Sequence, residues 1–212
     1  MKITKLLAAG VLVSLPAMAQ AQGWYAGIDV GAARSDAEID EYAFFGTATD
    51  RNSGDTTGIR LRGGFQFGRF FALELSYVDF GEFESHFDPD DCPNGAPGPC
   101  PVDVRTSING TVLTAVGIVP FGEHWFLNAR AGYGKMKIET QAFGATDIDG
   151  SSSNDGFHFG IGGGYRFNEH WNVLLDYSSY DQMDFGLTLS GAFGAYNQGE
   201  TTMTSLGVNY SW

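Results

Sequence analysis

The sequence is poor in positive charge and has no long apolar run after its N-terminal segment. Lys and Arg number 12 against 25 Asp and Glu, so the formal net charge of the 212 residues is -13. Nucleic-acid binding is therefore excluded, because contacts to phosphates need Lys and Arg. No stretch beyond residue 21 is apolar for the roughly 18 residues that a membrane-spanning helix requires. The acidic balance instead favours basic partners or divalent cations.

The N-terminal segment has the pattern of a secretory signal. "MKITKLLAAGVLVSLPAMAQA" begins with two lysines, continues with an apolar run from Leu6 to Leu15, and ends in small residues. This pattern predicts a cleaved signal peptide over residues 1–21, with cleavage after Ala19 or Ala21. The remaining residues, 22–212, are long enough for one domain and contain no linker that would divide them.

Cysteine is scarce as well. Cys92 and Cys100 both lie in "DPDDCPNGAPGPCP", a segment rich in Pro and Gly that has no strand pattern. A zinc site would need further Cys or His ligands nearby, and only His86 is close in the sequence. Because export leads to an oxidising compartment, we predict a disulfide between these two cysteines that pins the segment.

Alternation with a period of two dominates the rest of the chain. "TGIRLRGGFQFG", from Thr57 to Gly68, alternates apolar residues with Arg, Gln and Gly, and the segment that follows does the same, so the two predict a β-hairpin. In the strand before "FGEHW" the apolar series is Ile108, Val112, Val116 and Ile118. Three such hairpins share one design, with turns at 67–71 ("FGRFF"), 121–125 ("FGEHW") and 167–171 ("FNEHW").

One further strand at each end, beginning at Trp24 and finishing at Trp212, brings the number of predicted strands to eight. Each is expected to have roughly the 9 to 11 residues of a tilted membrane-spanning strand. Three connections are short, and four are long, polar and rich in glycine: 35–56, 81–105, 139–156 and 181–199. Short turns at one rim and long loops at the other are typical of an outer-membrane barrel. The predicted fold is all-β: an eight-stranded antiparallel up-and-down transmembrane β-barrel.

The strand pattern does not say which face points inward. A soluble barrel of the lipocalin kind would place the apolar face around a ligand, whereas a membrane barrel turns it to the lipid. Aromatic side chains bury roughly 150 to 250 Å² each, so the lumen of eight strands cannot hold all those on this face. We therefore expect the following to point outward: Trp24, Phe65, Phe67, Phe71, Tyr77, Trp125, Tyr133, Phe157, Phe159, Tyr165, Phe167, Trp171, Tyr177, Tyr210 and Trp212.

The opposite face consists of glycines and a few charges of both signs. By parity, Asp29, Arg60, Arg62, Glu74, Arg130, Arg166 and Asp176 point into the lumen. Unpaired charges are unfavourable there, so we predict a layer of salt bridges. Its members are Arg60, Arg62, Glu74, Arg130 and Asp176. Such a layer could form an ion path or a filled core, and the size of the barrel favours the filled core.

Two of the three turns contain the same dipeptide, Glu-His: Glu123 with His124, and Glu169 with His170. These side chains could meet across adjacent turns and bind a metal. The third turn has Arg69 and Phe70 in the same places, however, which a shared metal site would not tolerate and a turn would. We interpret the repeat as architecture, and we predict no metal, cofactor or catalytic residue.

Segments such as "FALELSYVDFG" and "LNARAGYG", with the eight strands and the signal peptide, resemble the OmpA-type outer-membrane β-barrel family over the whole mature chain. The alternation of Leu206, Val208, Tyr210 and Trp212 resembles the signal by which the β-barrel assembly machinery recognises its clients. The resemblance implies location in the cell outer membrane, with outer-membrane lipid and lipopolysaccharide as partners. OmpA itself continues into a peptidoglycan-binding domain, and because this sequence stops at Trp212 we do not expect cell-wall anchoring.

The expected function is that of a non-enzymatic barrel with a filled lumen. Four acidic extracellular loops would serve envelope integrity or surface interaction and adhesion, with an unidentified extracellular ligand. One alternative is a lipid-modifying enzyme like the lipid A deacylase and palmitoyltransferase families, which need a serine and a histidine near the outer leaflet. Here the strand histidine near that rim is His158, and by parity it points into the lumen. The other alternative is a narrow channel for small molecules.

Overall fold

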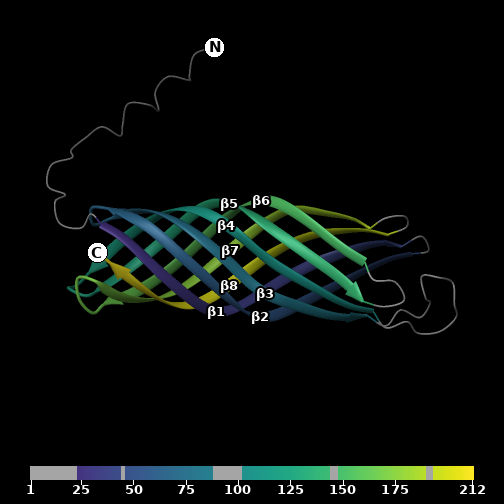
Figure 1. The fold of residues 1–212 in the computed structure, drawn as a ribbon, viewed down its shortest axis with the longest axis horizontal. Helices are drawn as coiled ribbons and strands as arrows, with labels where there is room; N and C mark the ends of the chain where they lie inside the picture. The colour runs from purple at the N-terminus through teal and green to yellow at the C-terminus, as the bar shows by residue number, and fades with distance from the viewer. Residues whose placement is uncertain (1–22, 44–45, 88–101, 144–147, 190–192) are drawn as a thin grey trace, which may run out of the picture.

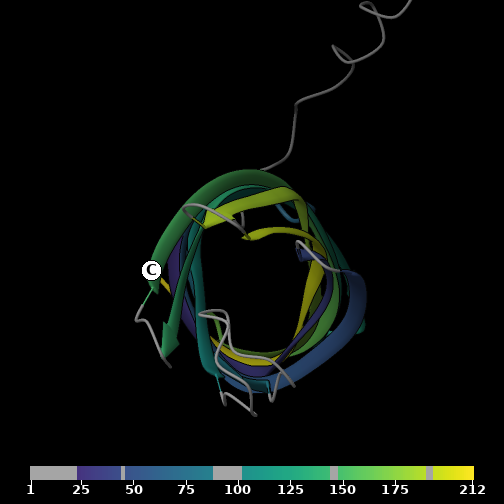
Figure 2. The same ribbon diagram turned by 90° about the vertical axis from the view of Figure 1, so that its right-hand side faces the viewer.

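The computed structural model describes residues 23–43, 46–87, 102–143, 148–189 and 193–212. The predicted signal peptide and the cysteines Cys92 and Cys100 lie outside these residues. Within them, no helix is long and apolar enough to cross a membrane. Eight antiparallel strands close into a barrel in the order β1-β2-β3-β4-β5-β6-β7-β8, as predicted (Figures 1 and 2). The strands are β1 (Gly23–Ala43), β2 (Gly46–Phe67), β3 (Phe71–Phe87), β4 (Val102–Phe121), β5 (Trp125–Phe143), β6 (Ile148–Arg166), β7 (Trp171–Leu189) and β8 (Phe193–Ser211).

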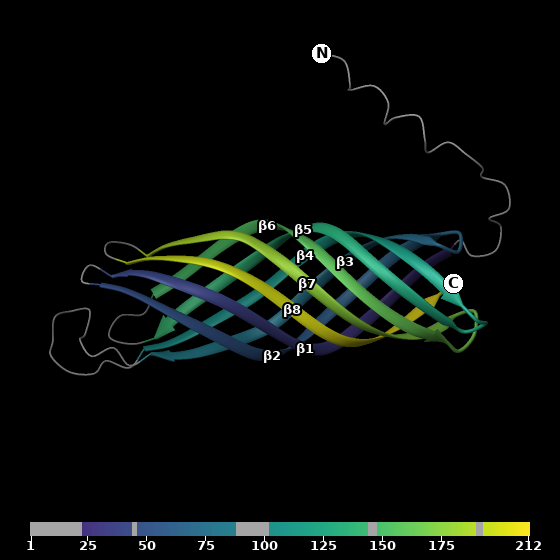
Figure 3. The same ribbon diagram turned by 180° about the vertical axis from the view of Figure 1, so that it is seen from behind.

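The three predicted turns connect β2 to β3, β4 to β5 and β6 to β7, all at the end of the barrel that holds the C-terminus (Figures 1 and 3). Gly68 and Gly122 adopt positive φ angles of 68° and 65° in the first two turns. That conformation is open to glycine at little steric cost. In the third turn Asn168 stands in the corresponding place, and its Oδ1 accepts hydrogen bonds from the backbone N–H groups of His170 and Trp171 at 2.9 and 2.8 Å.

Alternation along the strands places apolar side chains on the outer surface. On β5, Trp125, Leu127 and Tyr133 are all more than half exposed, whereas Asn128 and Arg130 are buried. Every aromatic residue that we expected on the outer face lies there: Trp24, Phe67, Phe71, Tyr77, Trp125, Tyr133, Phe157, Phe159, Phe167, Trp171, Tyr177, Tyr210 and Trp212 are exposed, and Phe65 and Tyr165 are partly so. A soluble protein does not expose an apolar surface of this extent to water, whereas a membrane barrel exposes it to lipid.

The strands are 17 to 22 residues long, about twice the predicted length. On β5 the apolar outward stripe spans nine residues, from Trp125 to Tyr133, and exposed Lys135 and Lys137 follow. The membrane-crossing part thus has the expected length, but all strands continue beyond it. Where the structure describes them, the segments that we predicted as long loops, 35–56, 81–105, 139–156 and 181–199, continue as paired strands. This prediction was wrong because polar, glycine-rich strands lack the apolar alternation on which it relied.

Beyond the membrane the barrel divides into two sheets. Among the described residues, pairing of β2 with β3 ends at Ile59 and Asp79, and pairing of β6 with β7 ends at Gly156 and Gln182. An irregularity in β3 or β7 begins at each of these points, between 79 and 82 and between 182 and 185. A bulge bends its strand. The bulge in β3 therefore turns this strand away from β2, and the bulge in β7 turns that strand away from β6. The extension therefore consists of the sheets β3-β4-β5-β6 and β7-β8-β1-β2.

The lumen contains two apolar clusters. The turn-end cluster is Ala72, Val116, Ile118, Phe126 and Leu174, with Tyr25 packed against it. The loop-end cluster is Ala33, Val78, Phe80, Phe83, Ile108, Val112, Met136, Ile138, Tyr180 and Met203. We expected mainly glycines and charges in the lumen, and the apolar series of β4 is in fact its inner face. The outer face of β4 carries Leu113, Val119 and Phe121, so both faces are apolar and their period alone does not distinguish them.

Candidate functional site

Six charged side chains from five strands meet in the lumen, each at most 6% exposed. They are Asp29 on β1, Arg60 and Arg62 on β2, Glu74 on β3, Arg130 on β5 and Asp176 on β7. We call these six the charged layer. It includes all five residues expected in the salt-bridge layer, together with Asp29. Arg166 does not join it, because its guanidinium lies 4.9 Å from the ring centre of Phe126 at the turn end of the lumen.

Arg60 is the most completely bonded member of the charged layer. Its Nε donates to Asp29 Oδ2 at 2.9 Å, and its Nη2 donates to Asp176 Oδ1 at 2.7 Å. Its remaining hydrogen bonds go to Ser178, Tyr180 and Ser205, at 2.9, 3.3 and 3.5 Å. A guanidinium with partners on three other strands holds β1, β7 and β8 at fixed positions around β2.

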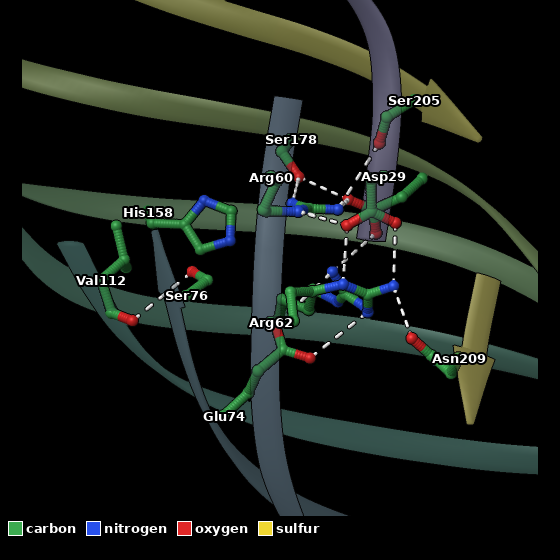
Figure 4. A network of polar contacts seen from close by, with 12 residues as sticks. Asp29, Arg60, Arg62, Glu74, Ser76, Val112, His158, Ser178, Ser205 and Asn209 are labelled. Atoms are coloured by element: carbon green, nitrogen blue, oxygen red, sulfur yellow. Dashed lines mark hydrogen bonds and ion pairs between the residues drawn. The ribbon is translucent and has the colours of Figure 1, made fainter. Parts of the chain in front are cut away.

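Arg62 shares Asp29 with Arg60 (Figure 4). Its Nη2 donates to Asp29 Oδ1 and to Asn209 Oδ1, each at 2.8 Å, and its Nε lies 2.6 Å from Asp29 Oδ2. Nη1 reaches Glu74 Oε2 at 3.3 Å, and the Tyr25 hydroxyl donates to the same oxygen at 2.9 Å. Asp29 is thus the carboxylate that joins the two arginines, and Tyr25 links the layer to the turn-end cluster.

Arg130 is held more loosely. Its Nη1 lies 3.5 Å from Asp176 Oδ2 and 3.9 Å from Glu74 Oε1. Neither its Nε nor its Nη1 makes a hydrogen bond within the described part of the chain. Its contribution is therefore mainly the neutralisation of two carboxylates, whereas Arg60 also provides directed hydrogen bonds.

The charged layer is neutral, since three arginines balance three carboxylates. It lies between the two apolar clusters: Tyr25 of the turn-end cluster bonds to Glu74, and Tyr180 of the loop-end cluster bonds to Arg60. Charges in such surroundings are tolerated because each has a partner of opposite sign. Among the described residues, the charged layer and the two clusters thus contact one another within the lumen.

His158 is buried beside this layer. Its ring stacks on Tyr180 with the centroids 4.4 Å apart, and its Nδ1 lies 3.3 Å from the backbone oxygen of Ser179. The nearby Ser178 hydroxyl is bonded to Arg60 and to Asp176, at 2.9 and 2.5 Å. In the described ranges no serine hydroxyl contacts His158, so the geometry provides no nucleophile with its base there.

The repeated turns dock against the neighbouring strand in one shared way. The backbone oxygen of the fourth residue in each repeat accepts a 2.8 Å hydrogen bond from the strand beside it: Phe70 from Ile118, His124 from Arg166, and His170 from Ser211. Both histidine rings also stack on a tyrosine, His124 on Tyr165 at 5.4 Å and His170 on Tyr210 at 5.6 Å. No group of three or more potential metal ligands occurs in the part of the chain that the structure describes.

The docking geometry predicts that His124→Phe is nearly neutral, with the free energy of unfolding changed by no more than about 0.5 kcal/mol. Phe70 already occupies the position of His124 in the first turn. His170→Phe should cost about 1 kcal/mol, because the His170 Nδ1 bond to Ser211 O, 2.9 Å long, is lost. Urea unfolding in detergent micelles measures both changes. A stabilisation of the wild type by zinc that His124→Phe abolishes would contradict the architectural interpretation.

The last strand presents its alternating residues outward. Leu206 and Trp212 are more than 60% exposed, and Val208 and Tyr210 are less so. Tyr210 packs against Trp171 at 4.9 Å and Trp212 at 5.9 Å, and the Trp212 N–H donates to Trp24 O at 3.1 Å. The terminal residues thus form an apolar outer stripe at the point where β8 closes onto β1.

Sequence parity indicated the face of each charged residue but not its partners. The hydrogen-bonding residues Tyr25, Ser178, Tyr180, Ser205 and Asn209 were not predicted. Ser178 and Tyr180 share the inward parity of Asp176 on β7, and Ser205 and Asn209 alternate with the outward residues Leu206, Val208 and Tyr210 on β8. All four could have been found in this way. Tyr25 has the same inward parity as Asp29, four residues away. It was missed because it is aromatic, like the residues that we expected on the outer face.

Comparisons with known proteins agree on the fold. A search of curated proteins finds no match. Solved structures that resemble the chain include OprG from Pseudomonas aeruginosa (15% identity, TM-score 0.52), Neisserial surface protein A (13%, 0.50) and the outer membrane protease OmpT from Escherichia coli (8%, 0.53). Each match covers 90% of this chain and 97% of the other. At such identities the likeness concerns the fold alone.

The family model described as "Outer membrane protein beta-barrel domain" matches residues 6–211, nearly the whole chain. The closed barrel and its apolar outer surface are consistent with that match. The chain therefore belongs to the outer membrane protein beta-barrel domain family and is a protein of the Gram-negative outer membrane.

Proposed function

We propose that this protein is a closed, non-enzymatic barrel that anchors acidic hairpins outside the cell, for envelope integrity or for surface interaction and adhesion. The β-barrel assembly machinery would recognise the outward stripe Leu206, Val208, Tyr210 and Trp212. Lipopolysaccharide would surround the outer half of the barrel, and an unidentified extracellular ligand would contact the hairpins.

The neutral charged layer between two apolar clusters is the observation that supports a closed barrel. An ion crossing the lumen would have to displace Phe126 or Leu174 at one level and Phe80 or Met203 at another. Between them it would meet arginines already bonded to carboxylates. Desolvation in such surroundings opposes ion passage.

Charge at the outer rim supports a surface role. The outward side chains above the apolar belt include Asp55, Asp79, Glu82, Glu84, Asp155, Asp181 and Glu200, all exposed. Such a surface would attract positively charged partners over distances near the Debye length. The paired strands would hold this acidic surface away from the membrane.

Single-channel recording on the reconstituted barrel tests closure. We expect no steady conductance from the wild type, and none from Arg62→Ala or Glu74→Ala, because the apolar clusters remain in place. A steady conductance that changes on either replacement would contradict the closed lumen and favour the channel alternative.

The enzymatic alternative has its own test. The resemblance to OmpT concerns fold, and His158 has a tyrosine ring and a backbone oxygen as neighbours. We expect no lipid A deacylation by the purified barrel. Clear turnover that His158→Ala abolishes would overturn the non-enzymatic assignment.

For the surface role, cells carrying hairpin-shortened protein should lose adhesion or serum survival, and unchanged behaviour would leave only an envelope-structural role.

A further inference from the structure

A chain of hydrogen bonds leads from the charged layer to the turn end of the lumen. Arg62 Nη2 donates to Asn209 Oδ1 at 2.8 Å (Figure 4), and Asn209 Nδ2 donates to Asn172 Oδ1 at 3.0 Å. Because a guanidinium can only donate, it fixes the direction in which each amide of the chain is oriented. The Asn172 NH₂ group therefore stands at the end of the chain, and no described residue accepts a hydrogen bond from it.

Arg166 lies beside Asn172 at this opening, which we call the mouth and which Arg166, Asn172 and Asn209 line on β6, β7 and β8. Arg166 and Asn172 are register partners on the inward face, which places their Cβ atoms about 4.5–5.5 Å apart. The Arg166 guanidinium lies over the Phe126 ring, 4.9 Å from its centre. Its side chain makes no ion pair or hydrogen bond with any described residue. The mouth thus presents an oriented cation next to an amide donor.

A second cation acts on the same mouth. Arg69 belongs to the turn between β2 and β3, on the opposite side of the eight-stranded ring from β6. Arg166 lies one residue beyond Tyr165, which pairs with Trp125 at the start of the apolar stripe of β5. At this place, burial and the positive charge of Arg69 lower the pKa of the Arg166 guanidinium. Among the described residues Arg69 makes no ion pair either, so no carboxylate of this part of the chain offsets the repulsion between the two arginines.

These groups match the chemistry of an oxyanion. The fork of a guanidinium donates two parallel hydrogen bonds to a carboxylate or a phosphate, and the neighbouring amide can donate a third. An anion between the two arginines would also offset their repulsion. The short turns of an outer-membrane barrel face the periplasm, so a ligand of the mouth comes from that side.

We propose that the mouth binds an oxyanion presented from the periplasm, a carboxylate or a phosphate, on Arg166, Arg69 and Asn172. Because Asn172 is connected through Asn209 to Arg62, the bound anion would extend the hydrogen-bond chain of the charged layer by one acceptor. The acidic outer rim and the cationic mouth would then take ligands of opposite charge on the two sides of the membrane.

The test is an NMR titration of the folded barrel in micelles of an uncharged detergent, with inorganic phosphate, acetate and soluble peptidoglycan fragments as probes. We expect saturable shifts of the Asn172 side-chain NH₂ and the Arg166 Nε–H signals with at least one probe. The probe that binds most tightly identifies the source as free phosphate or as the carboxylates of the cell-wall polymer. Arg166→Gln should weaken binding about tenfold, because charge-assisted hydrogen bonds are lost. Arg166→Lys keeps the charge without the fork and should weaken binding less.

Lys135→Gln is the matched control, because it removes one exposed positive charge at the other end of the barrel and should leave binding unchanged. The mobility of unheated samples on gels shows that each variant is folded. No saturable shift with any probe would overturn the proposal. Equal weakening in Arg166→Gln and Lys135→Gln would overturn it as well, because binding would then follow net charge and not the mouth.

Discussion

Replacing Arg60 by methionine should lower the free energy of unfolding by about 3–5 kcal/mol, the cost of breaking a buried ion pair by removing one partner. Methionine fills similar space but leaves Asp29 without one of its two arginines and removes the hydrogen bond to Asp176 Oδ1. The hydroxyls of Ser178 and Tyr180 also lose their contacts with the guanidinium. In this interior, water does not replace the lost arginine as the partner of the carboxylate, so the charge stays unpaired.

Arg130→Met is the matched control, because it removes the same charge from the same layer. Arg130 contacts its carboxylates at 3.5 and 3.9 Å without hydrogen bonds, and Asp176 keeps its bonds to Arg60 and Ser178. We expect a loss of less than half that of Arg60→Met. That result would mean that the layer stabilises the barrel through directed bonds more than through net charge.

Urea unfolding in micelles, followed by tryptophan fluorescence and by the mobility of unheated samples on gels, measures both variants. Equal losses from the two replacements would mean that charge balance alone matters. A loss below about 1 kcal/mol for Arg60→Met would mean that water reaches the layer and that the lumen is not filled.

Ile161→Arg should destabilise the barrel in a bilayer by about 2–4 kcal/mol, the usual effect of a cation on the lipid face near the midplane. Ile161 is 66% exposed in the middle of the outward stripe of β6, between Asp155 above and Phe167 below. If this face met water instead, arginine would be harmless, as are most exposed substitutions.

Ser151→Arg on the same strand provides the comparison. Ser151 is also outward and exposed, but it lies beyond the apolar belt, opposite Glu139. We expect a change within about 0.5 kcal/mol. Equilibrium unfolding in phosphatidylcholine vesicles measures both. Similar small effects at the two positions would contradict the placement of the bilayer around the turn-end half of the barrel.

The sequence was sufficient for the strand number, the turns and the outer face because these depend on local alternation. "FGRFF", "FGEHW" and "FNEHW" mark the three turns, and the aromatics are too large for the lumen. The same reasoning failed on β4, where Ile108, Val112, Val116 and Ile118 line the interior while Leu113 and Val119 face lipid. An apolar face is indistinguishable from its opposite when both are apolar.

The extensions beyond the membrane were predicted as loops because their stability comes from backbone pairing and not from an apolar stripe. Segments such as "IDGSSSND", residues 148–155, pair along β5 without any hydrophobic period. The irregularities after Asp79 and Gln182 that divide the extension into two sheets were not predicted either, although Gly81 adopts a φ of 79° at the first of them.

In the charged layer, parity identified the inward face but not the contacts across it. Arg60 bonds to Ser178 and Ser205, which are 118 and 145 residues away in the chain. Such pairings depend on the tilt and stagger of the strands in the closed barrel. Neither quantity is encoded in the pattern of one strand.

Quenching of the intrinsic fluorescence by brominated lipids tests the central claim, an inside-out barrel with an aromatic girdle at its turn end. All four tryptophans of the chain, Trp24, Trp125, Trp171 and Trp212, are exposed on the outer face at that end. Bromines near the headgroup end of the acyl chains should quench strongly and bromines at the bilayer centre weakly, with little effect of aqueous iodide. Strong quenching by iodide and none by lipid bromines would contradict the account.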